Sequence, residues 1–234
     1  MSDTPIALYY WPTPNGWKVS IMLEELGLPY EVHMVNIGAG DQFKPDFLAI
    51  SPNNRMPAII DPDGPDGREI SVFESGAILQ YLARKTGKFY GKDERARIAV
   101  DEWLMWQMGG FGPMLGQNHH FNKYAPEDVP YAKERYINET HRLYGVLDTR
   151  LDNREFIVDD YSIADMAAYG WSTGWENQKM DIDEFPNVKR WMAAMAARPA
   201  VERGMAVGRE EREKMQLATN KDQQAMLFGQ RARR

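Results

Sequence analysis

The sequence predicts an α/β domain at the N-terminus followed by an all-helical domain. Within residues 1–88, short β-prone runs alternate with segments of helical apolar spacing. Across residues 93–208 the apolar spacing is that of helices alone, and residues 86–92 between the two textures are expected to be the linker. With 234 residues, of which 43% are hydrophobic, the chain is long enough to bury a substantial core.

In the first domain we expect the element order β-α-β-α-β-β-α. The expected strands are residues 6–10, 30–35, 58–60 and 70–73, and the expected helices are residues 16–26, 43–50 and 75–85. Gly27 and Gly87 follow the first and last helices as stop signals. A Pro-, Gly- and Asp-rich loop at residues 61–68 joins the last two strands, so an antiparallel pair is expected to follow a parallel βαβ start.

The second domain is expected to contain helices at residues 94–107, 130–151, 162–175 and 186–197. Pro130 suits the first turn of its helix, and Ser162 can cap the next helix while Asp165 reaches back to it. Residues 209–234 form a charged C-terminal tail with one aromatic residue, Phe228, and are expected to be frayed or loosely docked.

Composition excludes several classes of function. The net charge is −6 and no segment carries a basic stripe, so neither nucleic acid nor an anionic membrane is an expected partner. No apolar run is long enough to span a bilayer and residues 1–5 do not resemble a signal peptide, so we expect a cytoplasmic protein. The chain has no cysteine, which rules out a protein-borne thiol nucleophile. His119 and His120 are adjacent and would point in different directions from a helix, so no metal site is expected.

Two short segments carry the chemistry. Pro57 stands directly before an apolar strand, where it cannot donate to the ladder. A cis Met56–Pro57 bond would let Met56 offer its backbone to an extended peptide ligand, whereas a trans bond would be an ordinary strand start. Glu74 and Ser75 lie where a strand passes into a helix, a position that favours an anion. The pair can hold an amino-acid zwitterion, or it can simply cap the helix.

Together these segments, the helical second half and the Ser162–Asp165 pair resemble the cytosolic glutathione transferases, over nearly the whole chain up to residue 208. The resemblance implies a thioredoxin-like first domain and an all-α second domain. It also implies a cis Pro57, pairing of the Met56 backbone with the cysteinyl part of glutathione, and binding of the γ-glutamyl group by Glu74 and Ser75.

Within that family, residues 13–18, 42–45 and 51–54 are similar to the Nu class, which includes bacterial glutathione-dependent disulfide-bond reductases. The similarity implies that Asn15 and Thr13 lie at the glutathione sulfur, Gln42 at the glycyl end, and that Arg135 reaches over from the helical half. It also implies a homodimer. A second-substrate pocket is expected among the following aromatic residues, each of which could instead belong to the core: Trp11, Phe111, Phe121, Tyr124, Trp171 and Trp175.

The expected chemistry depends on ionising the glutathione thiol. A free thiol has a pKa of about 8.5, and lowering it by two units needs roughly 2.7 kcal/mol of selective thiolate stabilisation. Helix-terminal N–H groups, the Asn15 amide and the Thr13 hydroxyl can supply it. Tyr9 and Tyr10 are alternative donors, since other classes of the family use a tyrosine, but both fall in the first expected strand.

Because the chain has no cysteine, disulfide exchange must run between glutathione and the substrate. The resemblance to disulfide-bond reductases then implies reduction of disulfides, with two glutathione molecules or one glutathione disulfide in the site. The alternatives are attack on a small-molecule electrophile, peroxidase activity, removal of glutathione from a thioether, and a regulatory glutathione-binding module with little activity.

Overall fold

The computed structural model describes residues 4–214 and 220–230. Its first domain holds a mixed four-stranded sheet in the order β2-β1-β3-β4, formed by β1 Ile6–Tyr10, β2 Tyr30–Met34, β3 Ala58–Asp61 and β4 Ile70–Phe73. β1 runs parallel to β2 and antiparallel to β3, and β3 is antiparallel to β4. The predicted parallel start and antiparallel pair are confirmed.

The helices of the first domain are α1 Pro14–Leu26, α2 Pro45–Ile50 and α3 Ser75–Thr86, with short 3₁₀ turns at Asp41–Phe43 (η1) and Pro65–Gly67 (η2). α1 begins two residues before the predicted start, because Pro14 fits the first helical position and Thr13 caps the helix by accepting from the Gly16 N–H at 3.3 Å. Asn15 therefore lies inside the first turn of α1 rather than in the loop before it.

The helical domain contains α4 Glu94–Trp106, the π-helical turns η3 Gln107–Phe111 and η4 His120–Tyr124, α5 Gly112–His119, α6 Pro130–Arg150, α7 Ile163–Ser172, the 3₁₀ turns η5 Trp175–Gln178 and η6 Ile182–Glu184, α8 Pro186–Ala196 and α9 Pro199–Ala206. The expected helices correspond to α4, α6, α7 and α8. α5 was missed, because Gly109, Gly110 and Pro113 suggest a break. The π-helical turn η3 instead carries the chain through them without a break.

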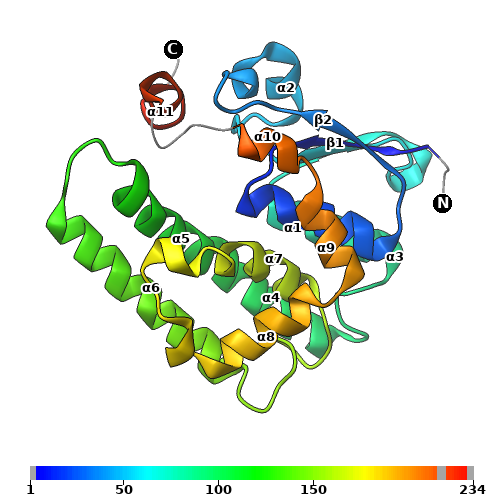
Figure 1. The fold of residues 1–234 in the computed structure, drawn as a ribbon. Helices are drawn as coiled ribbons and strands as arrows, with labels where there is room; N and C mark the ends of the chain where they lie inside the picture. The colour runs from blue at the N-terminus through cyan, green and yellow to red at the C-terminus, as the bar shows by residue number, and fades with distance from the viewer. Residues whose placement is uncertain (1–3, 215–219, 231–234) are drawn as a thin grey trace.

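α9 was also missed in the sequence, yet it packs closely on α1. A Cβ on Gly204 would lie 2.6 Å from the Ile21 Cα, and the Ser20 hydroxyl donates to the Gly204 carbonyl at 2.7 Å. α7 packs on α1 as well, and one hydrophobic core runs from the sheet through α1 into the helical domain. Figure 1 shows α1 lying between the sheet and the helices of the second domain. Its N-terminus is thereby held at the boundary between the domains.

The capping pair at the start of α7 is confirmed, and it is deeply buried. The Ser162 hydroxyl accepts from the Ala164 N–H at 3.2 Å, and the Asp165 carboxylate accepts from the Ser162 N–H at 3.0 Å. Asp165 also accepts from the Ile157 N–H and from the Trp191 indole at 2.9 and 3.0 Å. One carboxylate thus fixes the start of α7 against a loop and α8.

Over its described part the C-terminal tail forms α10 Arg209–Glu213 and α11 Lys221–Phe228. The Phe228 ring of α11 lies 4.5 Å from the His120 ring of the helical domain, and just after α11 the Asn54 amide of the first domain donates to Gln230 at 3.1 Å. The expectation that the tail is frayed or loosely docked stays a prediction. Residues 215–219 and 231–234 of the tail lie outside the described residues.

Candidate active site

The first turn of α1 brings the predicted sulfur-binding groups together at the domain boundary. Thr13 caps the helix and Asn15 follows at the second helical position, so both side chains and the Asn15 backbone N–H lie at the positive end of the helix dipole. The Thr13 hydroxyl lies 3.6 Å from the Met56 sulfur. This places Thr13 next to the residue expected to hold the cysteinyl part of glutathione.

Gly16 is required for this packing. A Cβ at Gly16 would lie 2.2 Å from the Trp11 carbonyl oxygen, 2.8 Å from the Tyr10 ring and 3.0 Å from the Met56 side chain. The absence of a side chain therefore lets the first turn of α1 lie directly against the end of β1 and the segment that precedes β3.

Asn15 has one fixed hydrogen bond, which comes from the other domain. The indole N–H of Trp171, on α7, donates to Asn15 Oδ1 at 3.1 Å. Within the described residues, the Asn15 amide nitrogen has no hydrogen-bond acceptor, so both of its N–H donors remain available. Sequence analysis expected Trp171 in the wall of a second-substrate pocket and did not connect it with Asn15.

The two tyrosines considered as alternative donors lie elsewhere. Tyr10 is fully buried and donates to the Val207 carbonyl at 3.2 Å, and burial raises its pKa well above the usual value. The Tyr9 ring stacks on His33 with the ring centres 4.9 Å apart and also contacts Phe47. The Tyr10 hydroxyl is thus engaged by a backbone carbonyl and the Tyr9 ring packs against His33 and Phe47, so the geometry favours the Asn15 amide as donor.

The Met56–Pro57 peptide bond is cis, as the resemblance implies. Pro57 is buried, whereas Met56 is half-buried beside the first turn of α1. The residue before Met56 is held by a hydrogen bond, in which the Ser51 hydroxyl donates to the Arg55 carbonyl at 2.7 Å. The structure thus brings Met56, Thr13 and Gly16 into one cluster.

Glu74 and Ser75 lie at the N-terminus of α3 in an unusual conformation. Glu74 has φ 68° and ψ 116°, and such a backbone costs about 1–3 kcal/mol for a residue with a side chain. Among the described residues no side chain caps α3, so Glu74 is not a simple capping residue. The exposed Glu74 carboxylate instead accepts from the Asn53 amide at 3.2 Å, while Ser75 is buried at the first helical position. Asn53, which the sequence places only within the 51–54 segment similar to the Nu class, is thus a neighbour of the candidate site.

A buried lysine, absent from the predicted site, lies directly behind Ser75. The Lys18 ammonium of α1 is 3.5 Å from the Ser75 hydroxyl and donates to Gln107 Oε1 at 3.0 Å. It also lies 3.3 Å from the Met108 sulfur. Burial lowers the pKa of Lys18 to about 7, against a weaker opposing effect of Glu74. An amine that is about half protonated at neutral pH is thus held between the domains beside the N-terminus of α3, where an anion is expected.

Two predicted glutathione-binding residues are not gathered at this cluster. Gln42 is buried, with its amide donating to the Ile37 carbonyl at 3.1 Å and its oxygen without a partner in the described chain. Arg135 is exposed on α6, where its charge acts on Glu139 one turn away. Their expected roles remain predictions.

The six aromatic residues expected in a pocket separate into two groups. Phe111 belongs to the core, because it is fully buried between Trp106 and Tyr144, with ring centres 4.9 and 5.6 Å away. Trp11 is also buried. Phe121, Tyr124, Trp171 and Trp175 are half-buried, and these four keep their place as candidate wall residues.

The tail brings further groups close to these aromatic residues. The Arg212 guanidinium of α10 lies 4.5 Å from the centre of the Trp17 ring, and its charge acts on Tyr10, His119 and Tyr124. The Tyr124 ring lies 5.9 Å from Phe228 of α11, and its hydroxyl is 3.2 Å from the His119 ring. Burial, with nearby positive charges, lowers the pKa of His119 to about 4, so this histidine is neutral.

His119 and His120 do diverge, towards Tyr124 and Phe228 respectively. Among the residues that the structure describes, no three His, Asp or Glu side chains gather as metal ligands.

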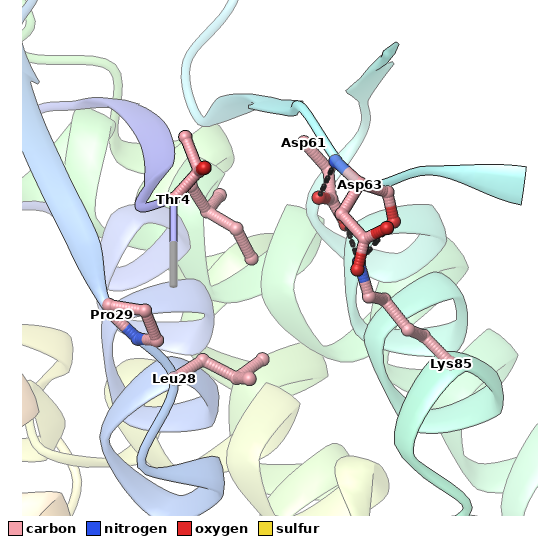
Figure 2. Close-up of a pocket in the computed structure, with 7 residues that line it drawn as sticks. Thr4, Leu28, Pro29, Asp61, Asp63 and Lys85 are labelled. Atoms are coloured by element: carbon pink, nitrogen blue, oxygen red, sulfur yellow. Dashed lines mark hydrogen bonds and ion pairs between the residues drawn. The ribbon is translucent and has the colours of Figure 1, made fainter. Parts of the chain in front are cut away.

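A separate depression lies at the opposite end of β1, as Figure 2 shows; it is lined by Thr4, Ile6, Leu28, Pro29, Asp61, Asp63 and Lys85. Lys85 is 2.6 Å from the Asp61 carboxylate, which also accepts from the Tyr81 hydroxyl at 2.7 Å. Burial tends to raise the pKa of Asp61, but these hydrogen bonds outweigh it and leave the pKa below its usual value. Lys85 pairs with Asp61 and Asp63 here, and none of the residues that line the depression belongs to the candidate site.

Both halves of the chain match family models, one described as the N-terminal domain of glutathione S-transferase over residues 4–84 and the other as its C-terminal domain over residues 115–199. Fold, site and matches therefore agree on one class, and the chain belongs to the glutathione S-transferase family.

Within the family, the chain is similar to bacterial disulfide reductases. It is 53% identical over 197 residues to the disulfide-bond oxidoreductase YfcG of Escherichia coli, which covers 83% of this chain and 92% of that protein.

Solved structures give the same answer. The chain is 50% identical to a glutathione transferase from Burkholderia graminis that has two glutathione molecules bound per subunit. That match has a TM-score of 0.82 and covers 86% of this chain and 87% of the other. The chain is 45% identical to a glutathione transferase from Pseudomonas putida that has one glutathione disulfide bound per subunit. That match has a TM-score of 0.84 and covers 87% of this chain and 91% of the other.

Proposed function

We propose that this chain binds glutathione and uses its thiolate to reduce disulfides. The observation that carries the proposal is the first turn of α1, where the Asn15 amide and the Thr13 hydroxyl meet the positive end of the helix in a chain without cysteine. Neutral donors can stabilise a thiolate there, and the thiol must come from the ligand. The names of the relatives and the glutathione or glutathione disulfide bound in similar structures support this choice.

The ligand is proposed to lie across three elements of the first domain. The α3 N-terminus with Ser75 binds the γ-glutamyl carboxylate, and the Glu74 carboxylate binds the γ-glutamyl ammonium. Met56 beside Pro57 pairs with the cysteinyl backbone, as an added strand would. Gln42 is assigned to the glycyl end and Arg135 to a contact from the helical half.

The reaction proceeds in two exchanges. The glutathione thiolate attacks one sulfur of the substrate disulfide, which forms a mixed disulfide and releases the other half as a thiolate that takes up a proton. A second glutathione thiolate then attacks the glutathione sulfur of the mixed disulfide. The products are glutathione disulfide and the second substrate thiol, so two glutathione molecules supply the two electrons and protons. Asn15 and Thr13 stabilise the attacking thiolate in each exchange.

Retention on immobilised glutathione, followed by turnover of glutathione with 2-hydroxyethyl disulfide, tests this function. We expect retention and catalysed formation of glutathione disulfide. A protein that is not retained and shows no turnover contradicts the proposal. Retention with turnover of an electrophilic aryl halide, a hydroperoxide or a glutathione thioether, but not of the disulfide, assigns the thiolate to conjugation, peroxidase or deglutathionylation chemistry. Retention with no turnover of any of them assigns a regulatory binding module.

Assembly, compartment and class form part of the same proposal. We infer a homodimer, supported by the exposed apolar residues Ile98 and Met105, which lie two turns apart on one face of α4 and are 53% and 52% exposed. Light scattering that shows only monomer would remove this inference. No helix in the described ranges is long and apolar enough to cross a membrane. The proposed compartment is the cytoplasm, where glutathione is kept reduced, and the proposed class is Nu.

A further inference from the structure

The Asn15 carboxamide can face its surroundings in two ways, with either its oxygen or its nitrogen on a given side. Only the nitrogen carries donors, so only one of the two orientations can stabilise a thiolate. A freely rotating amide on the first turn of α1 would present its oxygen to the sulfur part of the time, and an oxygen would repel the thiolate. The structure contains a group that removes this ambiguity.

That group is the indole of Trp171. An indole N–H can donate but cannot accept, so the atom that faces it at 3.1 Å must be the Asn15 oxygen. Both amide N–H groups are then directed away from Trp171. We propose that Trp171 is a positioning residue, whose indole N–H holds the Asn15 amide with its donors turned towards the reacting sulfur. This inference rests on the proposed function of Asn15.

The surroundings of Trp171 show that its ring is itself held in place. A Cβ on Gly112 would lie 3.0 Å from the Trp171 indole nitrogen, and one on Gly116 would lie 3.0 Å from the far edge of the ring. These two glycines are four residues apart on α5 and so share one face of that helix. The indole therefore lies in a flat slot that only residues without a side chain can form.

The backbone on each side of Trp171 is equally constrained. A Cβ on Gly170 would lie 2.9 Å from the Pro14 carbonyl oxygen, so glycine lets α7 approach the first turn of α1. On the other side, the Gln178 amide donates to the Trp171 carbonyl at 2.9 Å, and Gln178 is itself fixed by the buried Tyr144 hydroxyl at 2.9 Å. Position 171 is thus joined to α1 and η5, although it is 156 residues from Asn15 in the chain.

The test is a double-mutant cycle read through pH profiles of kcat/KM for disulfide reduction. Trp171→Phe keeps an aromatic ring in the slot but removes the donor. We expect the profile to shift by about one pH unit towards alkaline values, with activity near neutral pH about tenfold lower and activity on the alkaline plateau nearly unchanged. Because Trp171 acts through Asn15, the same substitution in an Asn15→Ala background should produce no further shift.

Two further variants separate positioning from a structural defect. Asn15→Asp keeps an acceptor for the indole but has no amide donors, and it should shift the profile at least as far as Asn15→Ala. Trp103→Phe is the matched control, since Trp103 is a half-buried tryptophan of α4 whose ring contacts Trp106 and Arg150. It should leave the profile unchanged.

Each outcome decides between the claims. A Trp171→Phe profile equal to that of the wild type, with a clear shift for Asn15→Ala, overturns the role of Trp171 and leaves the proposed function intact. A shift that persists in full in the Asn15→Ala background also overturns it, because Trp171 then acts by another route. If wild-type protein neither binds glutathione nor reduces the disulfide, the proposed function itself has failed.

Discussion

Lys18 offers a prediction that can be worked through from the structure. Its side chain is 1% exposed, and within the described part of the chain its polar neighbours are the Ser75 hydroxyl, the Gln107 amide oxygen and the Met108 sulfur, with no carboxylate hydrogen-bonded to it. Burial lowers its pKa from 10.5 to about 7. Because one pKa unit corresponds to about 1.4 kcal/mol, keeping this group charged inside the protein costs up to roughly 5 kcal/mol. We predict that Lys18→Met stabilises the fold near neutral pH.

The size of the gain follows from what the substitution also removes. Without the ammonium, Gln107 Oε1 loses its donor, which costs about 1–3 kcal/mol for a buried acceptor. The expected net gain is therefore roughly 3 kcal/mol at about pH 6 to 7. Because the pKa of Lys18 is lower in the folded than in the unfolded chain, the unfolded chain binds more protons between about pH 7 and 10.5, and wild-type stability rises with pH across that window. The variant lacks this rise, so the two stabilities should cross near pH 9.

Urea unfolding of wild type and Lys18→Met at about pH 6, 7, 8 and 9 measures the difference in their free energies of unfolding. That difference reports on Lys18, because the two proteins share all other titrating groups. Lys85→Met is the matched control: this lysine is paired with Asp61 at 2.6 Å, so its removal should destabilise the fold throughout. A Lys18→Met protein that is less stable than wild type at about pH 6, or a difference that does not change with pH, refutes the reasoning. A site that keeps an unpaired buried charge at such a cost is typical of function, which fits the proposed binding of a carboxylate beside Ser75.

Three other predictions follow from single contacts. Asp165→Ala should lower the free energy of unfolding by about 3 kcal/mol or more, since it leaves the Trp191 indole and two backbone N–H groups without an acceptor; urea unfolding that shows a loss under about 1 kcal/mol would contradict this. Wild type should lose stability as pH falls through the lowered pKa of Asp61, and Asp61→Asn should reduce that loss. If the free energy of unfolding of the variant falls at acid pH as steeply as that of wild type, the paired carboxylate does not contribute as argued. Phe228→Ala should raise KM for an apolar disulfide about two- to tenfold with kcat unchanged, because α11 loses its ring contact with His120; identical KM values in steady-state assays would place α11 outside the substrate's path.

Local patterns in the sequence located Met56 with Pro57 and Glu74 with Ser75 at strand and helix termini, and the family resemblance added Thr13 and Asn15. The roles of these residues in binding remain predictions. The same local patterns placed the strands and most helices. They failed at α5, where glycines that suggest a break instead form a π-helical turn and a slot for Trp171.

The remaining site residues depend on contacts between distant segments, which no local pattern encodes. Lys18 looks like an ordinary helix lysine until Ser75 and Gln107, 57 and 89 residues away, enclose it. Trp171 carried the signal of an apolar wall, because nothing near it in the sequence shows that Asn15 lies against its indole nitrogen. Arg212 was assigned to a loose tail, since the docking of α10 is a property of the folded chain.

The proposed chemistry depends most directly on Asn15 stabilising the thiolate of bound glutathione. The measurement is the pKa of the bound thiol, followed by thiolate absorbance in the ultraviolet, for wild type and for Asn15→Ala. We predict a wild-type pKa of roughly 6.5, about two units below that of the free thiol, and a value at least one unit higher in the variant. A bound thiol that titrates like free glutathione in the wild-type protein, or equally in both proteins, would contradict the central claim.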